Sequence, residues 1–353
     1  MISLINESNS KKDESEFEKW DNYERNFLSK WMSLLCGTKL CLKDLYLIGT
    51  HDSGAHFMNL NNPVDLINQP FDIHKWGWIP GIKNTITEWS IAQTKNFIEQ
   101  CEQGIRVFDL RCSLSKDGKF WIYHGFGCFP LSDGLSHFEY FTRKYPKEIL
   151  QLWLRIDCNL TDKNRKDLND LFLSYKNIMN DFKKYSEKTT LSELWINNIS
   201  WFVYINDNLS SENNLFGNLD DKVISPWINT SDPKTKIDGL IQQLINTSNR
   251  NERDSFYTFK WTVTPQLMTD ILPSYFIHPM CCGLNGNYGL NGNCGKFQTL
   301  QDMSLAFHPK FCVFSQEYEK LLKDKVNVLM IDFIEENSYF IQWMLIMNNN
   351  IIN

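Results

Sequence analysis

The sequence predicts an α/β fold built around a parallel β-sheet. Strand-like apolar runs alternate along the chain with segments of helical periodicity, which is the pattern of parallel-sheet proteins. One run, 148–157, is apolar almost without interruption, as strands buried on both faces are. A chain of 353 residues is long enough for two domains or for one α/β barrel. Because no charged run or Pro/Ser-rich linker divides it, we expect a single domain.

The first elements follow a polar N-terminal tail. Residues 1–16 are expected to be disordered, and 17–353 are expected to form the folded domain. Apolar side chains three to four residues apart over 17–35 indicate an amphipathic helix that packs against the domain. The apolar segment 45–50 then predicts a buried strand, which ends in a Gly-containing loop.

The next helix is marked by residues that begin and end helices. Thr85 and Glu88 have the spacing of a capping box, in which two side chains satisfy the first free backbone N–H groups. Gly104 is the residue type that commonly ends a helix. We therefore expect one helix over 85–103.

Strands and a hairpin are expected after this helix. The segment 105–111 follows it directly as a strand. The pair Asp117-Gly118 stands between two apolar runs, which is a hairpin signal, so 120–124 is expected to be the returning strand. The remaining expected elements are strands at 148–157, 199–205, 256–262 and 326–333 and a helix at 163–185.

Two insertions interrupt the alternation. Residues 206–254 are rich in Asn, Asp and Ser and are expected to form long loops with one helix near 234–247. Residues 281–295 are nearly all turn formers and contain two copies of Gly-Leu-Asn-Gly-Asn. Cys281 and Cys282 are adjacent and lack the spacing of a zinc knuckle, so we expect no zinc site there.

Charge and cysteine content exclude several classes of protein. The 36 Lys and Arg against 42 Asp and Glu give a net charge of −6, without the basic excess of a nucleic-acid-binding protein. Ten cysteines, mostly single within apolar runs, are typical of a reducing compartment. The N-terminus lacks a signal-peptide pattern, and no apolar run reaches roughly 18 residues. We expect a cytoplasmic or peripherally membrane-bound protein.

Polar residues at the ends of the expected strands form the candidate site. His51 and His124 fall at the C-terminal ends of two strands, and those ends form the active face of α/β barrels. Taken singly, either histidine is as compatible with a structural role. Asp109 and Arg111 lie two residues apart on one strand, so their side chains share a face. Asp332 ends another apolar strand.

These residue types fit phosphoryl transfer. Charges inside a barrel are costly unless they are paired or used, so Asp109 and Arg111 form either a structural ion pair or part of a site. One imidazole can take a proton, the other can give one, and the guanidinium can neutralise phosphoryl oxygens, with no metal required. A two-metal phosphoesterase needs clustered carboxylates and histidines, and the sequence shows no such cluster.

Four motifs in order carry a family resemblance. They are 49–53 (Gly-Thr-His-Asp-Ser), 89–93 (Trp-Ser-Ile-Ala-Gln) leading into 103–111, 123–125 (Tyr-His-Gly) and 152–155 (Leu-Trp-Leu-Arg). Together they resemble the X domain of phosphatidylinositol-specific phospholipase C, most closely the single-domain kind of bacterial enzymes and eukaryotic X-domain-containing proteins. The resemblance covers about 44–157 and, more loosely, 326–333. It implies that the α/β fold is a single distorted TIM barrel.

The resemblance implies a role for each matching residue. His51 would be the general base that deprotonates the inositol 2-hydroxyl, and His124 the general acid for the diacylglycerol leaving group. Asp52 would assist His124, and Asp332 would orient the base. Arg111 matches the arginine that takes the place of calcium in the bacterial type.

The resemblance also bears on substrate contacts and cofactors. Arg155 and Asp109 are expected to contact the substrate. Calcium-dependent relatives have Asn after the first histidine, where this chain has Asp52, and acids near the position of Arg111. We therefore expect no metal site, no calcium requirement and no other cofactor.

The resulting expectation is a monomeric, metal-independent phospholipase C that acts at phosphoinositide-containing membranes. It would cleave phosphatidylinositol-type lipids to diacylglycerol and cyclic or acyclic inositol phosphate. One alternative is a glycerophosphodiester-type phosphodiesterase, which would need metal-binding carboxylates. The other is a non-catalytic phosphoinositide-binding module, which would have no use for both an acid and a base.

Aromatic residues after the first strand are candidates for membrane contact. The chain has 12 Trp, 13 Tyr and 24 Phe, more than a core of this size usually holds. Trp76 and Trp78 lie in the loop-like stretch 71–81, which is expected at the active face, and Trp prefers the membrane interface. Packing in the core is the alternative for both rings.

Replacing Trp76 and Trp78 together by Ala is expected to weaken binding to phosphatidylinositol vesicles several-fold, because the rings would no longer insert. Hydrolysis of a soluble substrate analogue should be spared. Vesicle sedimentation and a solution assay measure the two effects separately. Equal losses in both would show that the rings pack in the core.

Overall fold

The computed structural model describes residues 25–58, 80–264, 299–334 and 338–352. The strands are β1 (Leu47–Thr50), β2 (Val107–Leu114), β3 (Phe120–His124), β4 (Phe126–Pro130), β5 (Leu150–Ile156), β6 (Trp201–Ile205), β7 (Phe216–Asn218), β8 (Val223–Ile224), β9 (Phe256–Trp261) and β10 (Val328–Ile331). The helices are α3 (Ile82–Ser90), α4 (Phe97–Glu102), α5 (Leu131–Lys144), α6 (Asp162–Leu173), α7 (Leu191–Ile196), α8 (Leu209–Glu212), α9 (Leu219–Lys222), α10 (Pro233–Asn246), α12 (Leu300–Phe307), α13 (Lys310–Glu317), α14 (Glu319–Lys325) and α15 (Ser338–Ile352). Short 3₁₀ helices are η2 (Trp31–Leu35), η3 (Leu42–Asp44) and η5 (Arg250–Glu252).

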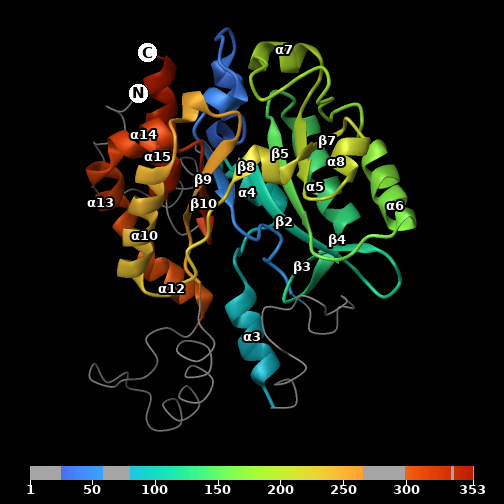
Figure 1. Ribbon diagram of the computed structural model, residues 1–353, viewed down its shortest axis with the longest axis horizontal. Coiled ribbons are helices and arrows are strands. Elements are labelled where there is room, and N and C mark those ends of the chain that lie inside the picture. Colours follow the sequence, from blue (N-terminus) through green and yellow to red (C-terminus); the bar gives the residue numbers. More distant parts are fainter. Residues whose placement is uncertain (1–24, 59–79, 265–298, 335–337, 353) are drawn as a thin grey trace, which may run out of the picture.

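Parallel strands form one curled sheet, a distorted TIM barrel. Their order is β7-β6-β5-β2-β1-β10-β9-β8, and each neighbouring pair is parallel. The path ends at β7 and β8, which α9 links along the chain, so within the described residues the barrel has an open seam there. Helices α10 and α12–α15 lie on the side of β9 and β10, and α5, α6 and α8 on the side of β5 and β7 (Figure 1). The α/β class and the distorted barrel are confirmed, whereas the single-domain assignment of 17–353 stays a prediction.

The end of β2 forms an antiparallel ribbon with β3 and β4 beyond the C-terminal edge of the barrel strands. Strand β2 is long, and its last residues pair with β3, as Cys112 does with Ile122. The turn contains Asp117-Gly118, with Gly118 at φ +78°, as the sequence predicts. Because β3 runs against the barrel strands, His124 ends an antiparallel strand and not a barrel strand.

The prediction of a single helix over 85–103 is wrong. Helix α3 ends at Ser90, and α4 begins after Asn96. The capping box is formed by Asn96 and Glu99, whose side chains accept each other's backbone N–H groups at 3.1 and 2.9 Å, and not by Thr85 and Glu88.

Several other elements differ in extent from their predictions. Of the helix expected over 17–35, the structure describes a helical turn at 25–28 and η2. The helix expected at 163–185 ends at Leu173. Residues 206–254 hold the helix expected near 234–247, which is α10, and also α8, β7, α9 and β8 where long loops were expected. The strand expected at 120–124 is β3, and the six other expected strands lie within a few residues of β1, β2, β5, β6, β9 and β10. Residues 281–295 lie outside the described residues.

Strand β4 and helix α5 have no counterpart in the sequence-based prediction, and neither do α7 and α12–α15. Strand β4 reads Phe-Gly-Cys-Phe-Pro, and both Gly and Pro are depleted in strands, so its sequence gives no strand signal. It forms because β3 supplies an antiparallel partner, with His124 opposite Phe126.

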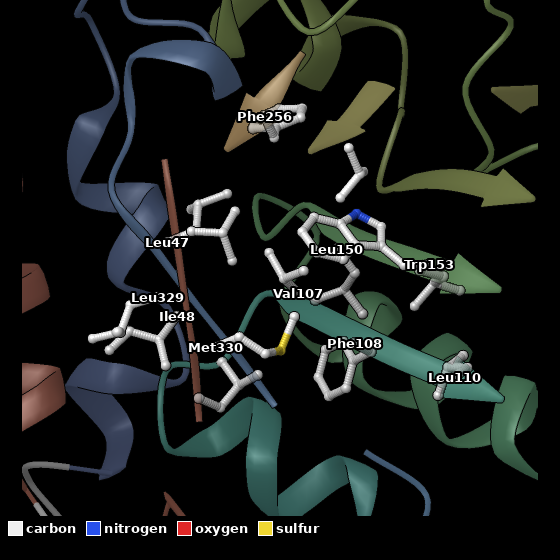
Figure 2. Close-up of a cluster of buried hydrophobic side chains, with 14 of the residues drawn as sticks. Leu47, Ile48, Val107, Phe108, Leu110, Leu150, Trp153, Phe256, Leu329 and Met330 are labelled. Carbon is white, nitrogen blue, oxygen red and sulfur yellow. The ribbon is translucent and has the colours of Figure 1, made fainter. Parts of the chain in front are cut away.

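The interior of the barrel is filled by apolar side chains below the candidate site. Leu47, Val107 and Met330 are fully buried on the inner face of three neighbouring strands, whereas Ile48, Phe108 and Leu329 are fully buried on the outer face, toward the helices (Figure 2). On the inner face, Gly49 lies in register with Val107 and Met330. A Cβ at position 49 would stand 3.0 Å from both side chains, so glycine provides the room that they occupy.

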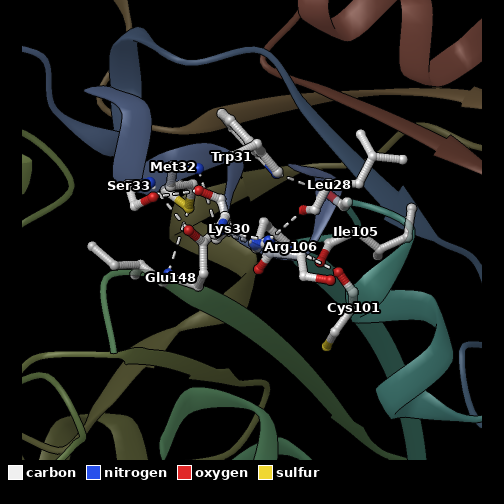
Figure 3. Close-up of polar contacts among 12 residues, drawn as sticks. Leu28, Lys30, Trp31, Met32, Ser33, Cys101, Ile105, Arg106 and Glu148 are labelled. Carbon is white, nitrogen blue, oxygen red and sulfur yellow. Dashed lines mark hydrogen bonds and ion pairs between the residues drawn. The ribbon is translucent and has the colours of Figure 1, made fainter. Parts of the chain in front are cut away.

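A buried ion pair attaches the N-terminal segment to the barrel. Arg106 and Glu148 have fully buried side chains, and Glu148 Oε2 accepts hydrogen bonds from Arg106 Nε and Nη2 at 2.8 and 2.6 Å (Figure 3). The same carboxylate accepts the backbone N–H groups of Met32 and Ser33. The other guanidinium N–H groups donate to the carbonyls of Leu28, Ser29, Cys101 and Ile105.

Glu148→Gln is expected to lower the free energy of unfolding by about 3–5 kcal/mol, because the Arg106 charge would stay buried without its carboxylate. Denaturant unfolding followed by circular dichroism measures the difference. The matched control is Glu139→Gln, which breaks a pair with Arg143, whose side chain is 75% exposed; it should cost less than about 1 kcal/mol. Similar losses in both variants would contradict the assignment.

Candidate active site

His51 lies at the centre of the candidate site, directly after β1. Its Nδ1 is 3.0 Å from Oδ1 of Asp332, which follows β10. The two residues emerge side by side because β1 and β10 are parallel, with Gly49 opposite Met330. With Nδ1–H donating to Asp332, a neutral His51 ring leaves Nε2 as its basic nitrogen. Within the described residues, this buried Nε2 has no hydrogen-bond partner.

Asp52 lies between one cation and two imidazoles. Its Oδ1 is 2.8 Å from Nε of Arg111, and its Oδ2 is 3.3 Å from Nε2 of His51 and 3.1 Å from Nε2 of His124. Burial alone would raise the pKa of Asp52, but Arg111, His124 and His51 together hold it well below its usual range. The φ of Asp52 is +43°, a left-handed conformation that Asp adopts more readily than most residues.

His124 is fixed through both ring nitrogens. Its Nδ1 donates to the carbonyl of Ser90 at 2.7 Å, while its Nε2 faces Asp52. Burial lowers the pKa of His124, and the Asp52 carboxylate opposes this shift. The carboxylate therefore stabilises a proton on Nε2 of His124. The geometry thus gives two imidazoles, each held at Nδ1 and each presenting its Nε2 to Asp52.

Gln93 holds the ends of β1 and β10 together. Its fully buried side-chain amide donates to the carbonyls of His51 and Ile331 at 3.0 and 3.2 Å. Those carbonyls belong to the two strands that carry His51 and Asp332. The distance between imidazole and carboxylate therefore depends on an amide from outside the barrel sheet.

The backbone beside Gln93 adds further links. The N–H groups of Ala92 and Gln93 both donate to the carbonyl of Ala55, in the loop after His51. Ala92 in turn accepts the N–H of Phe333, the residue after Asp332. These bonds use backbone groups that a continuous helix would satisfy internally, which is the physical reason for the break between α3 and α4.

Asp109 and Arg155 form a second pair beside Asp52. They come from the neighbouring strands β2 and β5, and Nε of Arg155 is 3.3 Å from Oδ1 of Asp109. Asp109 is buried, whereas the side chains of Arg111 and Arg155 are 34% and 29% exposed. The structure thus brings together all seven sequence-predicted residues that it describes: His51, Asp52, Asp109, Arg111, His124, Arg155 and Asp332.

Three further residues beside His51 were missed. The ring of Trp227 stacks on His51 with centroids 5.0 Å apart, and Nζ of Lys236 and Lys260 lie 4.9 and 4.8 Å from the Trp227 ring centroid. Trp227 and Lys236 come from 206–254, where the sequence has no clear periodicity. Lys260 stands in a mostly apolar strand, which is the kind of signal that identified Asp332.

The candidate membrane residues Trp76 and Trp78 lie outside the described residues, so their role stays a prediction. No helix in the described part of the chain combines the length and the apolar character that crossing a bilayer requires.

The compactness of the site raises the question of a metal ion. One ligand atom each from His51, Asp52 and Asp109 lies within 4.8 Å of the others. Asp52 already faces the guanidinium of Arg111 at 2.8 Å, and Asp109 faces that of Arg155. A divalent cation there would be repelled by both guanidinium groups, so this donor set suits a metal ion poorly.

Two known proteins illustrate what the chain is similar to in sequence. No protein-family model matches the chain. It is 29% identical over 240 residues to PI-PLC X domain-containing protein 2 of Homo sapiens, which covers 65% of this chain and 75% of that protein. It is 26% identical over 147 residues to 1-phosphatidylinositol phosphodiesterase of Staphylococcus aureus, strain Newman, which covers 41% of this chain and 39% of that protein.

A solved structure has a similar fold. The phosphatidylinositol-specific phospholipase C from Listeria monocytogenes superposes with a TM-score of 0.57 at 18% identity, covering 92% of this chain and 98% of that one. The resemblance to the phosphatidylinositol-specific phospholipase C X-domain family is thus confirmed, and so is the barrel fold.

Asp52→Asn is expected to move the pKa of His124 further below the ordinary value of about 6.5. The carboxylate is the main influence that opposes the effect of burial, so its removal should lower the pKa of His124. NMR titration of the imidazole signals measures it. Asp254→Asn alters an exposed carboxylate paired with Lys188 and serves as the control. An unchanged or higher pKa in Asp52→Asn would contradict the assigned contact.

Proposed function

We propose that the chain is a phospholipase C that cleaves phosphatidylinositol-type lipids to diacylglycerol and inositol phosphate. The observation that carries the proposal is the position of Asp52 between Nε2 of His51 and Nε2 of His124. Each imidazole is held at its other nitrogen by a different acceptor, Asp332 for His51 and the carbonyl of Ser90 for His124. Such a pair suits a reaction that needs one base and one acid. The names of the relatives support phosphatidylinositol as the substrate class.

The first step forms a cyclic phosphate. Nε2 of His51 takes the proton of the inositol 2-hydroxyl, and the resulting oxygen attacks phosphorus. The bond between phosphorus and the diacylglycerol oxygen breaks, and Nε2 of His124 gives that oxygen its proton. Asp332 stabilises the imidazolium that forms on His51. The products are diacylglycerol and cyclic inositol phosphate.

The second step reverses the proton roles. His124 now takes a proton from water, whose oxygen attacks the cyclic phosphate, and His51 returns a proton to the 2-hydroxyl. Inositol phosphate leaves, and both rings regain their starting states. Arg111 neutralises charge on the phosphoryl oxygens in both steps.

We also propose that no metal ion is essential. The Asp52 carboxylate raises the pKa of Arg111, which keeps the guanidinium charged under all working conditions. The guanidinium of Arg111 therefore supplies at this position the positive charge that a bound cation would otherwise provide.

A lipid substrate further requires contact with a bilayer, and we propose peripheral binding by a monomer through the face that carries the site. Phe57, in the loop after His51, is 57% exposed and is available for that contact.

Phosphatidylinositol vesicles incubated with the protein in EDTA are expected to release diacylglycerol. His51→Ala and His124→Ala should each slow release by about 10²- to 10⁴-fold, since each removes one proton transfer. The control is His137→Ala, on α5. Diacylglycerol release is measured by chromatography of the lipid phase.

A second substrate separates the two histidines. With inositol p-nitrophenyl phosphate, whose leaving group needs little protonation, His124→Ala should retain more of its activity than it does on lipid, while His51→Ala should not. Activity only with added divalent metal would indicate the glycerophosphodiester-type alternative. Vesicle binding without cleavage would indicate a non-catalytic module. Full activity in both variants would rule out the assigned mechanism.

A further inference from the structure

Gln100, on α4, joins that helix to the loop that follows β1. The residue is fully buried, and its Oε1 accepts a hydrogen bond from the hydroxyl of Thr50 at 2.8 Å. Its Nε2 donates to the carbonyls of Ser53 and Lys95 at 2.9 and 2.7 Å. Because a carbonyl can only accept, these two partners fix which end of the amide is the nitrogen. Both N–H groups and the oxygen of the amide are thus used.

The loop that this amide holds contains a tight turn at Asp52. The φ of Asp52 is +43°, a left-handed conformation that is unfavourable for a residue with a Cβ and persists only where the surroundings fix it. The backbone is fixed on both sides of the turn. The N–H groups of His51 and Ser53 donate to the carbonyls of Ile331 and Asp109, both at 2.9 Å.

The turn decides where two neighbouring side chains point. In an extended strand, adjacent residues face opposite sides of the sheet, so His51 and Asp52 could not both enter one site. With the turn, Oδ2 of Asp52 lies 3.3 Å from Nε2 of His51 and 3.1 Å from Nε2 of His124. The contact of one carboxylate with both imidazoles therefore depends on the backbone conformation at Asp52.

Gln100 is attached to the chain before and after this turn. Thr50, which donates to Oε1, ends β1, whereas Ser53, whose carbonyl accepts from Nε2, follows Asp52. The hydroxyl of Ser53 also donates to the carbonyl of Thr50 at 2.7 Å, which closes the loop. Thr50 and Ser53 are fully buried, so loss of the amide would leave a buried carbonyl without this donor. The left-handed conformation would then lose a support on both of its sides.

We propose that Gln100 is a positioning residue, whose amide holds the turn after β1 and thereby sets the Asp52 carboxylate against both imidazoles. Because Gln100 is fully buried, it acts through Asp52 and not on the substrate directly. Its effect on turnover rests on the proposed function, whereas its effect on the contact between Asp52 and His124 rests on the hydrogen bonds alone.

Asn348, on α15, provides a matched control at the other end of β1. Its Oδ1 accepts the N–H of Tyr46 at 3.0 Å, and its Nδ2 donates to the carbonyl of the same residue at 2.8 Å. Asn348 is buried, and Tyr46 directly precedes β1. Asn348→Leu therefore also removes a buried amide with backbone partners from the same strand, but at the end that carries no candidate site residue.

The contact can be followed through the pKa of His124. Burial lowers this pKa, and so do the nearby charges of Arg111 and His51. The carboxylate of Asp52 and the carbonyl of Ser90 act in the opposite direction. Withdrawal of the carboxylate should therefore lower the pKa of His124, and NMR titration of the imidazole signals measures the change.

Gln100→Met keeps the size of the side chain without its amide and should lower the pKa of His124, whereas Asn348→Leu should leave it unchanged. Loss of stability alone does not alter the titration of the molecules that stay folded. Thr50→Val, which removes only the hydroxyl that donates to Oε1, replaces Gln100→Met as the test if that variant does not fold. An unchanged or higher pKa in the folded variant would overturn the proposal, and so would an equal decrease in Asn348→Leu.

Turnover of phosphatidylinositol vesicles tests the consequence for the reaction. Gln100→Met should lower kcat about 10- to 100-fold with KM unchanged, because a displaced catalytic group slows the chemical step. Asn348→Leu should leave kcat unchanged, at a temperature where circular dichroism shows both variants folded. An unchanged kcat in Gln100→Met, or equal losses in the two variants, would overturn the proposal. A lowered pKa of His124 in Gln100→Met, together with no turnover of any lipid by the unmodified protein, would refute the proposed function and still support this inference.

Discussion

The interruption between α3 and α4 is the constraint on which the candidate site depends. The carbonyl of Ser90 fixes the imidazole of His124, the amide of Gln93 joins the strands that carry His51 and Asp332, and Ala92 holds the residue after Asp332. A helix that continued through these residues would use the carbonyls of Ser90 and Ala92 for its own hydrogen bonds and would leave the contacts of both carbonyls unmade. The two histidines are thus set in position by one short segment that belongs to neither of their strands.

The barrel interior below this segment has a graded polarity that favours the proposed chemistry. Val107 and Met330 fill the level of Gly49, and His51, Asp109 and Asp332 stand one alternate position above them. Water is therefore excluded from one side of the charged groups, so charges there interact more strongly than they would at an open surface. Asp52 stays ionised when buried because its carboxylate is in direct contact with Nε of Arg111, at 2.8 Å, and also faces both imidazoles.

The sequence predicts those parts of the site that local patterns determine. A carboxylate at the end of an apolar strand marked Asp332, and alternation placed Asp109 and Arg111 on one face. The helix break was not accessible, because Thr85 with Glu88 and Asn96 with Glu99 both match the capping-box pattern, and long-range bonds to Ala55 decide between them. Trp227 reaches His51 from a stretch with no periodic signal. A lysine within a mostly apolar strand is a signal that could have identified Lys260.

In the described sheet, β7 and β8 are the two ends of the strand order and do not pair with each other, which leaves the seam between them. A cleavage of the polypeptide within 219–222 would break no strand-to-strand bond of the described sheet, and the two fragments would stay joined through the ladder of β1 with β10. One fragment would contain both histidines, and the other would contain Asp332 and Lys260. The fragment with both histidines lacks Asp332, which holds the imidazole of His51, so activity recovered on mixing the two would report their reassociation directly.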